Sequence, residues 1–417
     1  MEALTRSFRS LQIVPYRQWS LAQLLSGSGG AASIVALAWL VVDLGGDGLA
    51  LGVVTSAMML PTLLLGSFAG TFVDRFSRRS VLLVTATTQM AVATTLAAVT
   101  LAGAETLVLL FALSLAHGLA FSVDNPARQL FVLDLVGRAR ITSAVSMNEV
   151  IINGSRVLGP AVAGALLVVA GPGWCFAFNA LMFIPSMVVL TRLRYLPNVQ
   201  EPASAVSSPF HTPGAGAGAD AHRAPATELL SPWQFVVRTG AVRSTLLLAV
   251  GAAASFNIAV VIPLVVADVF HADGGTYGAL AVAFGLGALP GAVFSATGPL
   301  VPRAGEVRAL AVGLAIAVIA AAAAPTLPLL FAGMALVGGA SMWFIARANA
   351  FVMLTTPNGI RGRVMGIWAM ALPGSSVITG LLTGILADAT DPRFAYGIVG
   401  VCTAFVVSIS WRTLRSR

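Results

Sequence analysis

Five polar residues of one long apolar segment, which begins at Thr142, fall on a single helical face. They follow one another at steps of four, three, four and three: Thr142, Ser146, Glu149, Asn153 and Arg156. This spacing places the five side chains on one side of an α-helix. At about 1.5 Å per residue, Glu149 and Arg156 are about 10 Å apart along the axis, so they cannot pair within the helix. Since a charge inside a bilayer costs about 3 kcal/mol, each needs a partner on another helix or a hydrated cavity.

Two kinds of chemistry suit these groups. A carboxyl binds or releases a proton when its hydration and its distance from a guanidinium change, so Glu149 is a candidate for proton coupling. Arg156 and Asn153 are candidates for contact with a substrate, and Arg156 for modulating that carboxyl. The alternative is a structural role, in which Glu149 and Arg156 only bind neighbouring helices.

A second polar face lies on the preceding apolar segment. Its members are again three or four residues apart: Ser114, His117, Phe121, Asp124 and Arg128. Asp124 and Arg128 can pair one helical turn apart, which lowers the cost of burying both. The pair either braces a gate or leaves Asp124 free to carry protons. His117 changes charge near neutral pH, or else stays neutral and bonds a neighbouring helix. Asp124 and His117 therefore join Glu149 as proton-coupling candidates.

Other apolar segments carry isolated groups that could line a substrate cavity. They are Gln23, Asn257, Arg347 and Trp343. Trp343 suits either a substrate surface or an anchor at the bilayer interface.

The composition requires that these segments lie in a membrane. Of 417 residues, 57% are hydrophobic and 10% charged, and the mean hydropathy is +0.90. A soluble domain has about 25% charged residues, so a soluble fold is excluded. The net charge of +8 is spread between the segments, which argues against binding of nucleic acid.

Twelve segments are long and apolar enough to span a bilayer. They cover residues 19–44, 50–73, 80–103, 106–130, 142–170, 173–190, 244–267, 277–301, 307–324, 327–355, 363–387 and 394–414. We expect an all-α membrane protein with an N-terminal six-helix bundle (1–192), a flexible cytoplasmic linker rich in Pro and Gly (193–242) and a C-terminal six-helix bundle (243–417). The last part of the linker, 229–238, is predicted to be a short amphipathic segment on the membrane surface.

The arginines predict the orientation of the spans. With both termini in the cytoplasm, 20 of the 24 arginines lie on the cytoplasmic side, three lie within spans and one lies outside. Cytoplasmic loops carry such an excess of basic residues, so we predict a multi-pass protein of the cell (inner or cytoplasmic) membrane with cytoplasmic termini.

Two pairs of loop sequences indicate an internal repeat. Residues 70–79 follow the second span, and 298–305 follow the eighth at an offset of 228. Residues 138–141 precede the fifth span, and 361–364 precede the eleventh at an offset of 223. Two six-helix repeats explain both matches.

The loop at 70–79 resembles the signature of the major facilitator superfamily. The matching residues are Gly70, Asp74, Arg75, Arg78 and Arg79, while Ser77 stands where the family usually has Gly. The resemblance implies a gating motif in which Asp74 meets the start of the eleventh span near Arg361 and Arg363. It also implies that the first, fourth, seventh and tenth helices line a central cavity.

A second stretch resembles the drug:proton antiporter-3 branch, which includes macrolide and enterobactin exporters. Gly159, Pro160 and Gly164 match its antiporter motif, but Ala165 replaces the final Gly. The resemblance implies export by antiport. Gly159 and Pro160 also suit helix packing and bending without any substrate contact.

We therefore predict a secondary active transporter. The expected activity is proton-coupled efflux of amphipathic drugs or siderophore-like compounds by alternating access; a lipid or lysolipid translocase of the same fold is the alternative. An enzyme is disfavoured because the four histidines are scattered, without a zinc-binding His-Glu-x-x-His motif. The chain has no Lys, so a phosphate-binding loop for ATP is excluded. The expected partners are a small amphipathic molecule, protons and membrane lipids, with no metal or cofactor, and the protein is expected to be a monomer.

Overall fold

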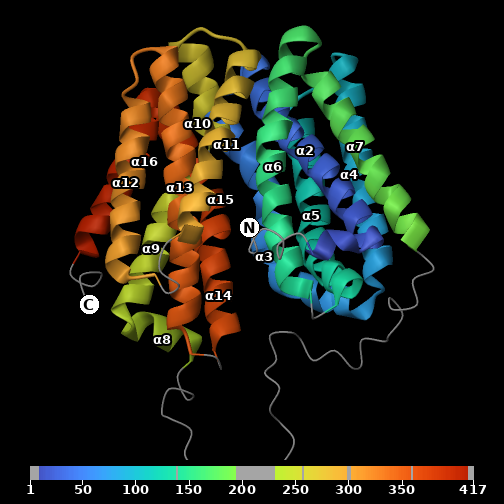
Figure 1. Cartoon of the computed structure of the whole chain (residues 1–417). Helices are drawn as coiled ribbons and strands as arrows, with labels where there is room; N and C mark the ends of the chain where they lie inside the picture. Colours follow the sequence, from blue (N-terminus) through green and yellow to red (C-terminus); the bar gives the residue numbers. More distant parts are fainter. Residues whose placement is uncertain are drawn as a thin grey trace, which may run out of the picture.

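The N-terminal half of the protein is a bundle of six long helices. The computed structural model describes residues 9–137, 140–193, 231–255, 258–297, 302–357 and 360–411. After a 3-10 turn, η1 (Arg9–Gln12), the helices of this half are α2 (Val14–Asp43), α3 (Gly48–Arg75), α4 (Arg78–Leu101), α5 (Leu107–Val136), α6 (Ile141–Val169) and α7 (Pro172–Arg192). Only short turns join them, so neighbouring helices in the chain run in opposite directions (Figure 1).

The C-terminal half repeats this arrangement with more breaks. Its elements are α8 (Pro232–Arg238), α9 (Gly240–Ser255), α10 (Ile258–Leu264), the π-helix η7 (Val265–Val269), α11 (Gly274–Thr297), α12 (Ala304–Ala322), α13 (Leu327–Thr355), α14 (Arg361–Ala369), the π-helix η8 (Met370–Gly374), α15 (Ser375–Ala389) and α16 (Pro392–Ile409). The predicted seventh span is thus divided into α9, α10 and η7, with residues 256 and 257 outside the described part. The eleventh span is α14, η8 and α15.

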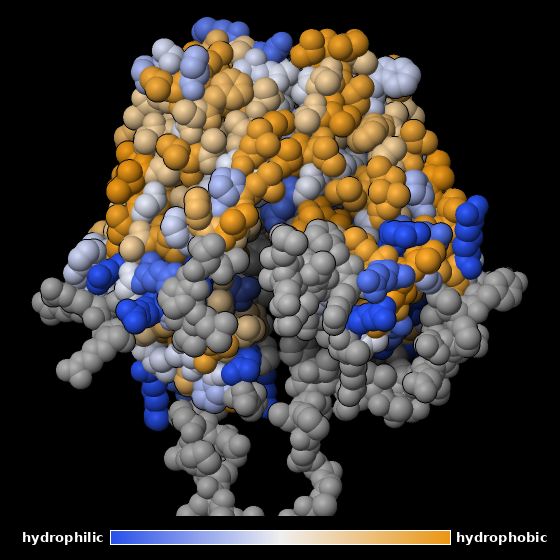
Figure 2. All heavy atoms as spheres, in the orientation of Figure 1, coloured by the Kyte–Doolittle hydropathy of each residue, from blue (hydrophilic) through white to orange (hydrophobic). Residues whose placement is uncertain are grey.

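The helices are long and apolar enough to cross a membrane. Within the described residues eleven helices meet this criterion, or up to twelve if the pair α8 and α9, bent by 97°, counts as one span. Apolar side chains cover the middle of the surface, and hydrophilic residues gather toward one end (Figure 2). An all-helical architecture suits such a surface because each helix satisfies its own backbone hydrogen bonds.

We call the end of the molecule at which α2 begins and α7 ends the linker face, and the other end the opposite face. Polar N-caps start helices at the opposite face: Asp47 accepts the Ala50 N–H (2.8 Å), Thr106 accepts that of Leu109 (3.3 Å), and Asp391 accepts that of Arg393 (2.7 Å). These caps satisfy donors that the first turn of a helix leaves free. The predicted spans therefore end in sharp turns at this face.

The short helix α8 occupies the predicted amphipathic segment. Phe235 and Val236 are buried, whereas Trp233 is exposed. Ser231 and Gln234 form a reciprocal capping box at its start, which fixes the helix. Most of the predicted linker lies outside the described residues, so the division of the chain at 193–242 stays a prediction.

The two halves meet near the opposite face, through α3 with α15 and α6 with α11. Glycines allow the backbones to touch: a Cβ atom on Gly48 would lie 2.5 Å from the Gly384 oxygen, and one on Gly278 would lie 2.4 Å from Gly164 Cα. Trp39 of α2 also stacks on Tyr277 of α11, with ring centroids 6.4 Å apart. Figure 1 shows the halves diverging toward the linker face, and the surface is hollowed between them in Figure 2.

Candidate functional site

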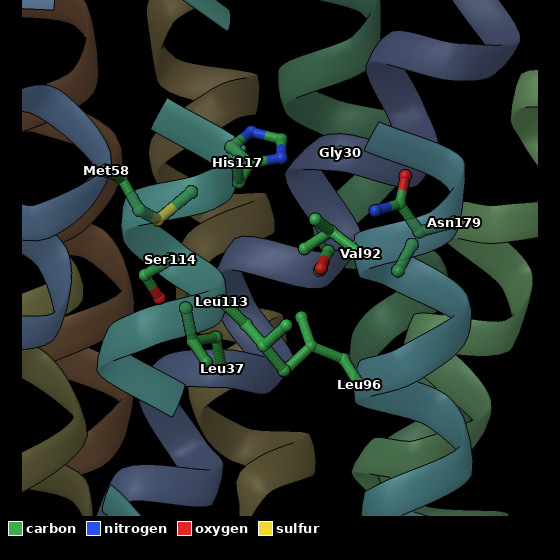
Figure 3. A pocket seen from close by; sticks show the side chains of 11 residues that line it. Gly30, Leu37, Met58, Val92, Leu96, Leu113, Ser114, His117 and Asn179 are labelled. Atoms are coloured by element: carbon green, nitrogen blue, oxygen red, sulfur yellow. The ribbon is translucent and has the colours of Figure 1, made fainter. Parts of the chain in front are cut away.

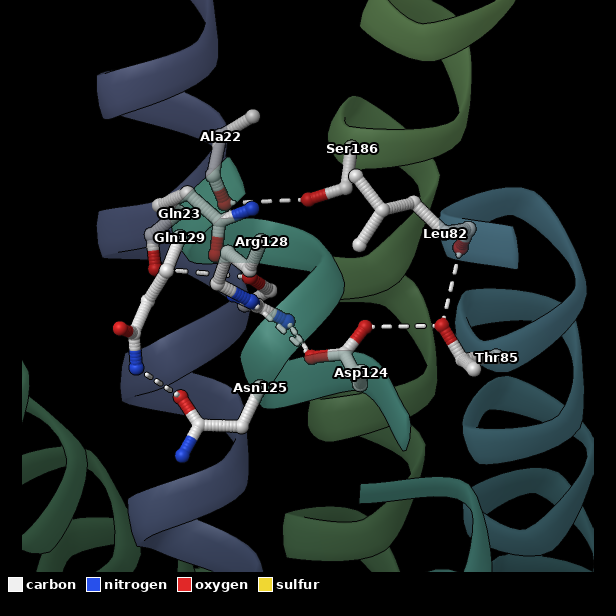
Figure 4. Close-up of polar contacts among 10 residues, drawn as sticks. Ala22, Gln23, Leu82, Thr85, Asp124, Asn125, Arg128, Gln129 and Ser186 are labelled. Carbon is white, nitrogen blue, oxygen red and sulfur yellow. Dashed lines mark hydrogen bonds and ion pairs between the residues drawn. The ribbon is translucent and has the colours of Figure 1, made fainter. Parts of the chain in front are cut away.

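Asp124 of α5 is held by donors from two helices. It is 1% exposed. Arg128, one turn away, donates from Nε (2.9 Å) and Nη2 to Oδ2, and Thr85 of α4 donates to Oδ1 at 2.8 Å (Figure 4). The predicted pair is confirmed, whereas no pattern in the sequence distinguished Thr85 from the other threonines of α4. With one oxygen paired to a guanidinium and the other hydrogen-bonded to a hydroxyl, Asp124 is better suited to bracing α4 against α5 than to exchanging protons.

The basic residues of the loop motif hold the N-terminal half together at the linker face. Arg78, at the start of α4, pairs with Asp134 near the end of α5. Arg79 donates from Nε to the Leu190 oxygen of α7 at 2.6 Å. The side chain of Arg75 is exposed. The side chain of Asp74 lies outside the described part of the structure, so the gating contact stays a prediction.

Of the three candidate residues on α6, the structure describes the side chains of two. Asn153 is buried and Arg156 is exposed, while the side chain of Glu149 lies outside the described part. Gln23 is buried on α2, and Asn257 lies outside the described residues. Gln23 and Asn153 are thus both buried in the N-terminal half, and their contact with a substrate stays a prediction.

The residues of the antiporter motif pack helices together. A Cβ atom on Gly159 would lie 2.6 Å from the Ser28 oxygen of α2. Gly164 and Pro160 face Gly278 of α11, whose Cβ atom would lie 3.3 Å from the Pro160 oxygen. The motif thus places α6 between α2 of its own half and α11 of the other half, which agrees with the packing role considered from the sequence.

His117 of α5 faces a small cavity inside the N-terminal half (Figure 3). The cavity also contains Ser114 of the same helix and Asn179 of α7. The imidazole stacks against Phe121, with ring centroids 6.3 Å apart and planes at 11°. Of the two proton-coupling candidates whose side chains the structure describes, His117 and Asp124, it is His117 that lines this cavity.

Arg347 of α13 is turned into the C-terminal half, where it is 5% exposed. Its Nε and Nη2 donate to the two carboxylate oxygens of Glu306 on α12, at 2.5 and 2.9 Å, and its Nη1 donates to the Ser295 oxygen of α11 at 3.4 Å. Trp343, one turn earlier, packs on Phe294 of α11 at 5.4 Å between ring centroids. These contacts give Arg347 a structural role in joining α11, α12 and α13. Glu306 was missed, although the offset of 228 between the repeats places it opposite Arg78.

The halves are also joined by polar contacts near the opposite face. Asp388 of α15 accepts the N–H groups of Gly48 (2.5 Å) and Leu49 (2.8 Å) at the start of α3. Ser56 of α3 donates to the Val377 oxygen of α15 at 3.0 Å. Neither contact was predicted, because nothing local in the sequence connects residues more than 300 positions apart.

Metal binding finds no support among the described residues, which contain no group of three or more His, Cys, Asp or Glu placed to hold an ion. A membrane-spanning bundle of two similar halves, with buried charge in each and close contact near one face, is the architecture of a secondary transporter.

Comparison with known proteins agrees with this class. Residues 5–415 match the transmembrane secretion effector family of the major facilitator superfamily. The chain belongs to this family, and it is a multi-pass membrane transporter and not an enzyme.

Two relatives differ in how much of the chain they cover. The multidrug efflux pump Tap of Mycolicibacterium fortuitum is 26% identical over 406 residues, which cover 91% of this chain and 93% of that one. The staphyloferrin A transporter of Staphylococcus aureus is 27% identical over 162 residues, or 39% of this chain, and the match spans 41% of its length.

Solved structures share the fold. The nucleoside transporter NupG has a TM-score of 0.72 at 14% identity, covering 97% of this chain and all of that one. A bacterial homologue of the iron transporter ferroportin, in an inward-facing state, has a TM-score of 0.71 at 16% identity, covering 96% and 99%. These similarities confirm the predicted two-repeat major facilitator fold.

Proposed function

We propose that this protein exports amphipathic small molecules from the cell in exchange for protons, by alternating access. The observation that carries the proposal is the similarity to a multidrug efflux pump over nearly the whole chain. The shorter match to a siderophore transporter supports the same substrate class, since both kinds of cargo need an apolar cavity with a few polar groups. Alternating access is supported by the way the two halves meet. The contacts of α3 with α15 and of α6 with α11 lie near the opposite face, and the halves diverge toward the linker face (Figure 1).

The proposal assigns the linker face to the cytoplasm, on the strength of the 20 arginines predicted there. The hollow between the two halves (Figure 2) would then open toward the cytoplasm. Cysteines at Ser208, in the linker, and at Asp273, at the opposite face, should be labelled from opposite sides of the membrane. Labelling of both by an impermeant reagent from outside would contradict this orientation.

Roles within the site follow from the charges. Glu149 and His117 are the proposed proton carriers, and Asp124 is the weaker candidate because Arg128 and Thr85 already satisfy it. Arg156, Asn153 and Gln23 are proposed to contact the cargo. Arg347 has its donors engaged by Glu306, so it is the weaker substrate candidate of the C-terminal half.

Transport by purified protein in liposomes tests the proposal. A panel of cationic dyes, macrolides, siderophores and a lysolipid should be offered with and without an imposed pH gradient, and with a proton ionophore as control. We expect accumulation of an amphipathic drug or siderophore that the gradient drives and the ionophore abolishes. Movement of the lysolipid alone, independent of the gradient, would favour the translocase alternative. Failure of every gradient to drive flux would refute antiport.

A further inference from the structure

The cavity beside His117 contains buried polar atoms without a protein partner. Ser114 is 2% exposed and Asn179 is 3% exposed, and neither Ser114 Oγ nor Asn179 Oδ1 has a hydrogen-bond partner. Both side chains line the cavity from α5 and α7, together with the hydroxyl side chain of Ser33 from α2 and apolar residues of α2, α3 and α4 (Figure 3). Because buried polar atoms are costly unless they are hydrogen-bonded, a polar ligand is expected between them.

The size and chemistry of the cavity select that ligand. The space is sufficient for a water molecule. A water can donate to Asn179 Oδ1, exchange a hydrogen bond with Ser114 Oγ, and reach the imidazole. The side chains that line the cavity from α2, α3, α4 and α7 are all uncharged, which disfavours a metal cation.

We propose that this cavity binds a water molecule held by Ser114 and Asn179, and that His117 receives its proton through that water. The proposal deepens the proposed function, because it names the residues that serve one of the two proton carriers. A hydronium ion in the cavity transfers one proton to the unprotonated ring nitrogen, and the remaining water then accepts a hydrogen bond from the new N–H. Deprotonation reverses both steps, so the proton is the only species gained or lost.

The charges around His117 make this water important. On α5 the nearest carboxylate is that of Asp124, two turns away and already bound by Arg128 and Thr85. No described side chain lining the cavity from the other helices carries a charge that could stabilise an imidazolium. The bound water therefore supplies an acceptor for the protonated ring, beside the neutral oxygens of Ser33, Ser114 and Asn179.

Two serines of α5 provide a matched test. Ser114 and Ser122 are both 2% exposed, but Ser122 Oγ donates to the Leu119 oxygen of its own helix at 2.8 Å and does not line the cavity. Ser114→Ala removes a ligand of the water, whereas Ser122→Ala removes only a local bond. Protein labelled with 15N at its four histidines reports protonation directly, and His117→Gln identifies the His117 signals.

We expect Ser114→Ala to shift the midpoint of the His117 titration to lower pH and Ser122→Ala to leave it unchanged. Equal midpoints in the two variants, or a ring that keeps one protonation state throughout, would overturn the proposal. This readout needs no transport, so it is independent of whether pH-driven export is found in liposomes.

A separate observation concerns the contact of Asp388 with the start of α3. A carboxylate is favourable at a helix N-terminus, where N–H groups lack partners, and here it belongs to the other half of the molecule. Asp388 is the residue before the last of α15, just as Asp74 is the residue before the last of α3. From the loop signature that residues 70–79 resemble, Asp74 is expected at the start of α14. This helix begins the same span whose last turn carries Asp388.

We infer that Asp388 is the counterpart of Asp74 at the opposite face, and that the two contacts form alternately. In each contact, an aspartate in the last turn of a helix of one half would bind the first turn of a helix of the other half. The Asp388 contact holds the opposite face closed, and the Asp74 contact would hold the linker face closed. Together they would set the balance between the two conformations of the transport cycle.

Asp388→Asn tests this inference, because it keeps the shape of the side chain but removes its charge and replaces one acceptor oxygen by a donor. Asp391→Asn is the control, since Asp391 caps α16 within the C-terminal half (2.7 Å to the Arg393 N–H). Spin labels at Ala104 and Ala323, near the opposite face of each half, report the separation of the halves in Cys402→Ser protein.

Because Asp388 remains exposed to solvent, we expect a population change of about threefold to tenfold toward separation of the halves at the opposite face. Asp74→Asn should shift the population the other way, and the double variant should return toward the unaltered protein. An Asp388→Asn variant that matches Asp391→Asn would overturn the inference.

Discussion

The two halves of the protein bury charge in different ways, although they share one fold. At the linker face of the N-terminal half, Arg78 of α4 pairs with Asp134 of α5. In the C-terminal half, Glu306 of α12 pairs with Arg347 of α13. The offset of 228 makes Arg78 and Glu306 equivalent, so the third helix of each repeat contributes one member of an ion pair, but with opposite sign.

This reversal indicates that each repeat needs an ion pair between its third and fourth helices, but not a particular sign on either helix. A pair that joins the third and fourth helices satisfies both charges whichever helix carries the base. The N-terminal half has further polar groups, in the Asp124 and Arg128 pair and in the cavity of His117. In the C-terminal half, the offset of 223 places Leu372 opposite Glu149 and Thr379 opposite Arg156. We therefore expect proton coupling in the N-terminal half and a mainly structural use of charge in the C-terminal half.

The largest effect on stability is expected from breaking the pair of the C-terminal half. Arg347→Met leaves Glu306 partly buried without its main partner and should lower the free energy of unfolding by about 2 to 4 kcal/mol. Thermal unfolding in detergent measures the loss. The double variant Arg347→Met with Glu306→Leu should recover more than half of it; no recovery would mean that the pair is not what holds these helices.

A smaller effect is expected from Asp124→Asn in the N-terminal half. The amide keeps a bond to Thr85, and Arg128 is exposed enough to be hydrated, so we expect a loss of about 1 to 2 kcal/mol. If Asp124 only braces α4 and α5, transport by the folded variant should keep its pH dependence. Loss of pH dependence without loss of stability would instead make Asp124 a proton carrier.

The smallest effect is expected at helix caps that the halves share. Asp47 caps α3, and Asp273 caps α11 by accepting the Thr276 N–H at 2.9 Å and its hydroxyl at 2.8 Å. The hydrogen bonds from Thr276 lower the pKa of Asp273. A carboxyl whose pKa is lower in the folded protein than in the unfolded chain stabilises the fold at pH values above the unfolded pKa of about 3.9. This stabilisation is lost as the pH falls through the folded pKa.

Asp273→Ala should therefore cost about 0.5 to 1 kcal/mol at neutral pH and less below about pH 4. Unfolding measured across that range provides the comparison, with Asp47→Ala as the matched variant of the other half. A cost that is the same at acid and neutral pH would show that the charge of Asp273 plays no part.

The sequence predicted features that depend on neighbours along the chain. Long apolar segments gave the spans, and the spacing of Asp124 and Arg128 predicted their pair, because four residues make about one helical turn. Thr85 and Glu306 were missed because their partners lie on other helices, whose relative rotation no local pattern determines. The contact of Asp388 with α3 was missed for the same reason, since it needs the two halves to be placed side by side.

Glu149 provides the most direct test of coupling in the N-terminal half. Unaltered protein and Glu149→Gln, reconstituted in liposomes at equal amounts and in the same orientation, should be compared for export driven by a pH gradient and for downhill exchange. We predict that Glu149→Gln still binds its cargo but no longer concentrates it against a gradient. If the variant still drives uphill export with unchanged pH dependence, Glu149 is structural, and the proton carrier must be sought at His117 or Asp124.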